Sequence, residues 1–64
     1  MIDVQIRVAE DEIRDLQRII RATEAVLEME KSPERRTALA KELGDLKFRV
    51  DRLRQKIENL RRCD

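Results

Sequence analysis

Residues 27–39 read LEMEKSPERRTAL and contain the only proline of the chain, which predicts where the chain reverses direction. Ser32 can cap a helix that starts after it, and Pro33 fits the first position of that helix. Proline also disfavours helical geometry at the residue before it, so a preceding helix must end here. Glu34 then faces the positive end of the second helix dipole. These rules predict a turn at residues 32–33, the middle of the chain.

Two apolar ladders run outward from this turn, one in each half of the chain. Each steps by alternating four and three residues, which is the spacing of a coiled-coil seam. The predicted seam residues are Ile6, Ile13, Leu16, Ile20, Leu27, Leu39, Leu43, Leu46, Val50, Leu53, Ile57 and Leu60, with Ile2, Ala9 and Thr23 in the same ladder. In the register that Pro33 sets, Ile20 faces Leu46, and the other seam residues pair likewise. The sequence therefore predicts an all-α fold, an antiparallel two-helix coiled-coil hairpin with helices at 3–31 and 33–62.

The small size of the chain points to self-association. Its 64 residues are 45% charged and 2% aromatic, a composition typical of long helices. Two helices bury only one seam, and Cys63 is alone, so no disulfide framework can add stability. The chain has no His, so we expect no metal site and no cofactor. We therefore expect one hairpin domain, residues 1–64, that assembles into a four-helix or larger bundle or binds a partner.

Charged residues supply a second prediction of the register, because the first helix is mainly acidic and the second mainly basic. Asp3 is the expected N-cap of the first helix, and Lys31 is expected in its last turn. Gly44 is expected inside a continuous second helix, since the ladder passes it without a change of phase. Four pairs of opposite charge should face each other across the seam: Asp3 with Arg61, Glu10 with Arg54, Glu12 with Lys56, and Glu30 with Arg36.

Apolar residues outside the seam predict a further contact surface. One stripe lies beside the seam of the first helix, and a second, expected on the opposite flank, runs through Thr37 and ends at Phe48. The candidate interface residues are Ile19, Ala22, Val26, Met29, Ala40, Gly44 and Phe48. A helix with a wide apolar stripe touches two neighbours, which can be another protein or a second copy of the chain. A lone exposed Phe48 can also have no role.

The basic end of the second helix is a candidate nucleic-acid contact through Arg49, Arg52 and Arg62. The alternative is a solvated and partly paired helix face, because aromatic residues that could stack on bases are absent. The neighbouring Cys63 is either a thiol activated by the arginines or an incidental terminal residue.

Several functions find no support in the composition. The chain has no His, Tyr or Trp and no Gly-rich loop, so we expect neither an enzyme nor a small-molecule substrate. No apolar run is long enough to span a membrane, and the N-terminus lacks the pattern of a secretory signal. An unpaired Cys63 suits a reducing compartment, so we expect a cytoplasmic protein.

The layout of about 60 residues, with two equal helices and one tight turn, resembles the Rop family of plasmid RNA-binding four-helix bundles. It is also similar to small co-chaperones of type III secretion needle subunits and to small phage inhibitors of host proteins. These resemblances cover the architecture alone, so no residue role is carried over from them. The function expected is a protein–protein interaction module, such as an adaptor, small chaperone or inhibitor, acting through helix-face docking and homo-oligomerisation. The alternatives are a Rop-like nucleic-acid-binding bundle and a purely structural oligomer.

Overall fold

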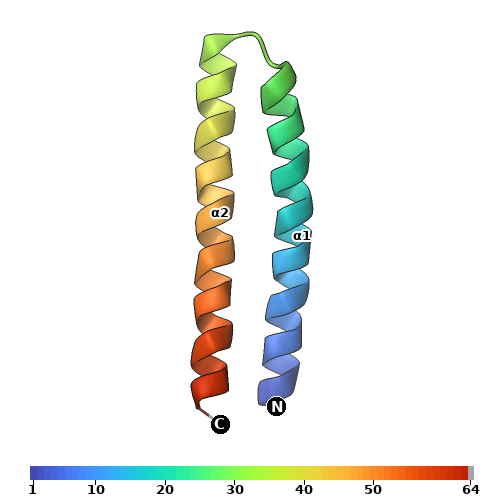
Figure 1. Ribbon diagram of the computed structural model, residues 1–64, viewed down its shortest axis with the longest axis vertical. Coiled ribbons are helices and arrows are strands. Elements are labelled where there is room, and N and C mark those ends of the chain that lie inside the picture. The colour runs from blue at the N-terminus through green and yellow to red at the C-terminus, as the bar shows by residue number, and fades with distance from the viewer. Residues whose placement is uncertain (64) are drawn as a thin grey trace.

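The computed structural model describes residues 1–63 and consists of two α-helices joined by a short loop (Figure 1). Helix α1 spans Ile2–Met29, and helix α2 spans Pro33–Arg62. The helices lie side by side and run in opposite directions, so the start of α1 and the end of α2 share one end of the molecule (Figure 1). The Cα atoms extend over 49 × 15 × 11 Å. The prediction of an all-helical two-helix hairpin is confirmed, and Asp64 of the predicted domain lies outside the described residues.

The buried side of each helix follows the four-three ladder. All of the ladder residues are buried or half-buried: Ile2, Ile6, Ala9, Ile13, Leu16, Ile20, Thr23 and Leu27 on α1, and Leu39, Leu43, Leu46, Val50, Leu53, Ile57 and Leu60 on α2. Leu16, Leu46 and Val50 form a buried cluster, against which Ile13, Ile20 and Leu53 pack. Even Thr23 fits this strip, because its hydroxyl donates to the carbonyl oxygen of Ile19 at 2.8 Å. The core is therefore a single strip between two helices.

Helix α1 ends two residues earlier than the sequence predicts, at Met29 and not at residue 31. Glu30 (φ −78°, ψ 128°) and Ser32 (φ −75°, ψ 123°) are both extended. The ring of Pro33 disfavours helical geometry at Ser32, and a reversal this tight leaves no room for another helical turn. Lys31 consequently lies in the loop. At the other end, Met1 occupies the N-cap position that was predicted for Asp3, which lies in the first turn.

Two arginines near the start of α2, Arg35 and Arg36, bind residues at the end of α1 and in the loop. Arg36 Nη1 donates to the carbonyl oxygens of Leu27 and Glu30, both at 3.0 Å. The carbonyl oxygen of Leu27 also accepts the backbone N–H of Glu30 at 3.3 Å, so Arg36 adds a second donor at the C-terminal end of α1. Arg36 thus binds the backbone of Glu30, whose carboxylate instead lies 3.7 Å from Arg35. Ser32 holds the N-cap position of α2, but its side chain makes no capping bond; its N–H donates to Glu30 Oε1 at 3.2 Å.

The ion pair that Glu10 makes across the seam is shifted by one heptad from the predicted partner. The ion-pair partner of Glu10 is Arg61, at 3.8 Å, and not Arg54. A second pair across the seam joins Glu24 and Lys47 at 3.7 Å. Each Cα–Cβ bond tilts toward the N-terminus of its own helix. In oppositely directed helices Glu10 and Arg61 therefore lean toward each other, whereas Arg54 leans away. Two other predicted pairs form no ion pair within residues 1–63: Asp3–Arg61 and Glu12–Lys56.

Candidate protein-interaction surface

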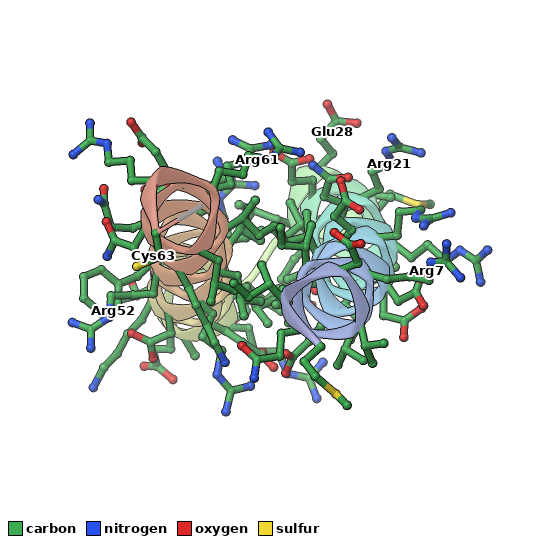
Figure 2. The ribbon with its side chains drawn as sticks, turned by 90° about the horizontal axis from the view of Figure 1, so that it is seen from below. Arg7, Arg21, Glu28, Arg52, Arg61 and Cys63 are labelled. Carbon is green, nitrogen blue, oxygen red and sulfur yellow. The ribbon has the colours of Figure 1, made fainter. Side chains whose placement is uncertain are left out.

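The seam has a shallow groove on each side, and one of these grooves is lined mainly by charged residues. Its lining residues are Glu10, Ile13, Arg14, Arg54, Ile57, Glu58 and Arg61. The Glu24–Lys47 pair lies on the same side, fourteen residues along each helix from Glu10 and Arg61. Figure 2 shows Arg21, Glu28 and Arg61 together on this side of the helix pair. We call this surface the polar flank and define it by Glu10, Arg14, Glu24, Lys47, Arg54, Glu58 and Arg61.

The groove on the other side is bordered by exposed aliphatic residues of α1. Two adjoining depressions form it, one lined by Val4, Gln5, Val8, Ala9, Glu12, Leu53 and Lys56, the other by Glu12, Leu16, Phe48, Arg49, Arg52 and Leu53. Ile19 and Val26 lie one and two heptads after Glu12, so they face the same side of α1. Ala22 and Met29 lie two and three heptads after Val8. We call this surface the aliphatic flank and define its α1 part by Val8, Ile19, Ala22, Val26 and Met29.

The large side chains of the aliphatic flank are open to solvent. Ile19 is 48% exposed, Val26 51%, Val8 60% and Met29 82%. These residues cannot serve the core of the hairpin, because the seam between the helices is already filled by other residues. Helix α1 therefore has apolar residues on two sides, of which α2 covers only one. A helix of this kind is typical of a bundle in which it touches a second neighbour.

The sequence prediction missed the part of this surface that lies nearest the N-terminus. Val4 and Val8 are exposed by 62% and 60%, and both line the groove with Glu12. Val8 occupies the same heptad position as Ala22 and Met29, so its spacing carried the signal. The polar residues Glu12 and Asp15 interrupt the stripe between Val8 and Ile19, which made the stripe look confined to the loop half of the helix.

Phe48 is not on the flank that the sequence predicted for it. The expectation was that Phe48 and the Ile19–Val26 stripe lie on opposite flanks, but Phe48 lines a groove with Glu12. Phe48 points almost directly away from the seam, so its ring can turn toward either side. The guanidinium of Arg52 lies 5.7 Å from the ring centroid, and this cation–π contact holds the ring on the side of the aliphatic flank.

Ala40 and Gly44 lie on the polar flank, away from the aliphatic residues of α1. Ala40 is one heptad before Lys47, and Gly44 is two heptads before Glu58. No atom lies within 4 Å of the place where a Cβ on Gly44 would be. Thr37 donates its hydroxyl to the carbonyl oxygen of Pro33 at 3.0 Å. The structure therefore divides the predicted interface residues between two flanks.

The candidate nucleic-acid contacts are likewise divided. Arg49 and Arg52 border the same groove, and Arg52 lies on the outer side of α2 (Figure 2). Arg62 Nη2 donates to Glu58 Oε1 at 3.0 Å and is thus engaged within its own helix. Arg49 and Arg52 share their groove with the carboxylate of Glu12, which reduces the positive field there.

The structure also bears on a metal site, on the thiol of Cys63 and on a membrane span. Within residues 1–63, no group of three or more His, Cys, Asp and Glu side chains is arranged to hold a metal ion. Cys63 is a free and exposed thiol. Neither α1 nor α2 combines the length and the apolar character needed to cross a membrane.

Comparison of this chain with protein-family models, with curated proteins and with solved structures finds no match.

Proposed function

We propose that this protein is a non-enzymatic protein–protein interaction module that acts through helix-face docking and homo-oligomerisation. The observation that carries this proposal is the row of half-exposed aliphatic side chains on a helix whose seam is already filled. Burial of a Val or Ile side chain contributes about 1.5–3 kcal/mol relative to full exposure, so each residue of the aliphatic flank is available to stabilise a complex.

The accessible surface of the hairpin supports this reading. It amounts to 5446 Å² for a chain of 7.6 kDa. A compact monomer of this mass exposes about 4,300 Å². The excess arises from the elongated shape, in which each helix has one neighbour. Packing of further helices against the aliphatic flank would remove it.

The proposed mechanism is an extension of the packing already present in the hairpin. The alternating four-three spacing on both helices favours coiled-coil packing between them, with side chains of one helix set between those of the other. On α1 the same spacing recurs in Ile19, Ala22, Val26 and Met29. An incoming helix can pack on this second ladder as α2 packs on the first. An adaptor, a small chaperone and an inhibitor all use such a surface, and a free Cys63 fits a reducing cytoplasmic location.

The test compares Val26→Asp with Ala25→Asp, which adds the same charge at the neighbouring exposed position of α1. Sedimentation over a concentration series should show the wild type associating and Val26→Asp remaining a single hairpin, because a carboxylate cannot be buried in an apolar contact. Ala25→Asp should associate like the wild type, and circular dichroism should show equal helix content in all three. A wild type that stays a single chain at every concentration contradicts homo-oligomerisation through this flank.

Nucleic-acid binding through Arg49 and Arg52 is an alternative outcome of the same experiments. Affinity for an RNA or DNA probe that falls steeply between low and moderate salt, and that Arg49→Glu with Arg52→Glu abolishes, would favour it. Helix-face docking should change little with salt and should be lost in Val26→Asp. A purely structural oligomer would associate with itself and bind no other molecule.

A further inference from the structure

The half of the aliphatic flank nearer the loop is bordered on α2 by carboxylates. Glu42 lies one heptad before Arg49, and Asp45 lies one heptad before Arg52. Because both arginines line the groove of this flank, Glu42 and Asp45 face the same side, and both are exposed. We call Glu42 and Asp45 the α2 carboxylates. They place negative charge beside the aliphatic residues of α1.

A further carboxylate of this surface lies on α1 itself. Asp15 is one heptad before Ala22, so it faces the aliphatic flank just before the row of aliphatic residues that starts at Ile19. Within residues 1–63, neither Asp15 nor the α2 carboxylates form an ion pair. These charges are therefore available to a partner.

Basic side chains lie at the edges of this region. Arg35, next to the loop, lies 3.7 Å from the carboxylate of Glu30, which offsets its charge. By their heptad positions, Lys41 occupies the outer side of α2 and Arg18 the outer side of α1. Arg49 follows the acidic stretch, near the middle of α2. The loop half of the aliphatic flank is thus an apolar surface with mainly acidic surroundings.

The aliphatic residues in this half suit one short helix. Ile19, Ala22, Val26 and Met29 recur at the three-four spacing and extend over about 15 Å along α1, at about 1.5 Å per residue. The side of a docked helix that faces α2 would lie over the α2 carboxylates, which lose water when they are covered. Lysine or arginine on that side supplies a cation, and its aliphatic stem can lie along the apolar surface.

We propose that the loop half of the aliphatic flank binds an amphipathic helix of another protein, in which lysine or arginine residues border the apolar face on the side toward α2. This inference rests on the proposed function and specifies its partner. Apolar contacts with Ile19 and Val26 supply most of the affinity. The α2 carboxylates select the partner, because an acidic or wholly apolar helix leaves them without a cation.

A second copy of the chain satisfies the carboxylates only in part. In a two-fold dimer with its loops at opposite ends, Glu12 and Asp15 of each copy face Ala22 and Ile19 of the other. In one with both loops at the same end, the α2 carboxylates face Ile19 and Val26. Either arrangement covers carboxylates with apolar side chains. A different protein avoids this cost, because its charges are not tied to those of the hairpin by symmetry.

Two synthetic helical peptides test the charge of the partner. Both carry leucines at the spacing i, i+3, i+7 and i+10 on an alanine background, and the positions that border the leucines are lysine in one and glutamate in the other. At protein concentrations where sedimentation shows single hairpins, fluorescence anisotropy should give a dissociation constant at least about tenfold lower for the lysine peptide. The difference should shrink at about 1 M salt. A lysine peptide of the same composition with its leucines scattered should bind at least about tenfold more weakly than the ordered one.

Charge reversal on α2 locates the contact. Glu42→Lys with Asp45→Lys should reverse the preference, so that the glutamate peptide binds more tightly than the lysine peptide. The control Asp51→Lys with Glu58→Lys makes the same change in net charge on the opposite side of α2 and should keep the wild-type preference. Circular dichroism should show equal helix content in all three proteins. Equal loss of lysine-peptide binding in both double variants would mean that net charge alone attracts the peptide, which overturns the inference.

The outcomes separate this inference from the proposed function. Ile19→Ser with Val26→Ser should abolish binding of the lysine peptide, because the apolar contact is lost. Two peptides that bind the wild type equally, and that this variant no longer binds, leave helix-face docking in place and overturn the selection of a basic partner. A chain that binds neither peptide but associates with itself through the flank makes a second copy the occupant, which also overturns the inference. A chain that does neither contradicts the proposed function itself.

Discussion

The two flanks of the hairpin differ in how their side chains are satisfied. On the polar flank, Glu10 and Glu24 reach across the seam to Arg61 and Lys47 at 3.8 and 3.7 Å. On the aliphatic flank, Ile19 and Val26 are about half exposed and have no helix beside them within the chain. One side of this small molecule therefore carries ion pairs across the seam, and the other carries exposed aliphatic side chains.

This difference shows why the apolar content of a helix can exceed what its own chain uses. The seam needs only one residue in every three or four, and α1 provides that series in full. The additional aliphatic residues lie on one flank and leave the other polar. Such segregation is typical of a surface with a defined partner, whereas scattered exposed apolar residues need no explanation.

The largest expected effect comes from the seam, which supports both flanks. Leu16→Ala removes a side chain that is 7% exposed and should lower the free energy of unfolding by about 2–5 kcal/mol. Val26→Ala should cost less than about 1 kcal/mol in a dilute solution of single hairpins, because half of Val26 is already in water. Urea denaturation followed by circular dichroism measures both. At high protein concentration the loss in Val26→Ala should grow, since the proposed association through the aliphatic flank would then add to stability. Equal losses for the two variants in dilute solution would remove the distinction between seam and flank.

Gly44→Ala tests whether the polar flank stays open to solvent. The substitution should raise stability by up to about 1 kcal/mol, because glycine is unfavourable inside a helix and space for the methyl group exists. For a chain of this size the thermal midpoint should rise by about 4–8 °C per kcal/mol. The solution mass should not change. Weaker association of Gly44→Ala would show that another backbone packs here, and the polar flank would then be an interface too.

The smallest expected effect is that of a single ion pair on the polar flank. Glu24→Gln removes the partner of Lys47, and both side chains are about half exposed. The free energy of unfolding should fall by about 0.2–1 kcal/mol at low salt and by almost nothing at about 1 M salt, where exposed charges are screened. Glu28→Gln is the matched control on the same helix. An effect of Glu24→Gln that persists at high salt would mean that this pair is shielded from water by an additional contact.

Much of the fold could be predicted from the spacing of apolar residues and from Pro33. The ladder predicted which side of each helix is buried. Residues spaced alternately three and four apart lie on one face of a helix, and in a helix pair this face contacts the other helix. The end of α1 was misplaced, since the local rules at Ser32 and Pro33 do not say how many residues the reversal needs. The predicted partner of Glu10 was also wrong. The prediction paired residues at equal height along the seam and did not include the tilt of each Cα–Cβ bond toward the N-terminus of its helix.

The candidate site could be predicted only in part. The stripe from Ile19 to Met29 was visible in the sequence, but Val8 was hidden by the polar residues that interrupt the stripe. Phe48 was assigned to the wrong flank, because a position opposite the seam has no preferred side until Arg52 covers the ring. What lies on the aliphatic flank could not be predicted, since one chain carries only its own half of a contact.

The bonds of Arg36 imply an order of folding. Arg36 is nine residues from Leu27 in sequence, whereas Arg61 is more than fifty from Glu10. Because the entropy lost on closing a loop grows with its length, contacts near the turn form at lower cost than those at the far end. We therefore expect folding to nucleate at the turn, with contacts between the helices then forming progressively toward Ile6 and Leu60. Folding kinetics would record this as a φ-value near one for Arg36→Ala and near zero for Leu60→Ala.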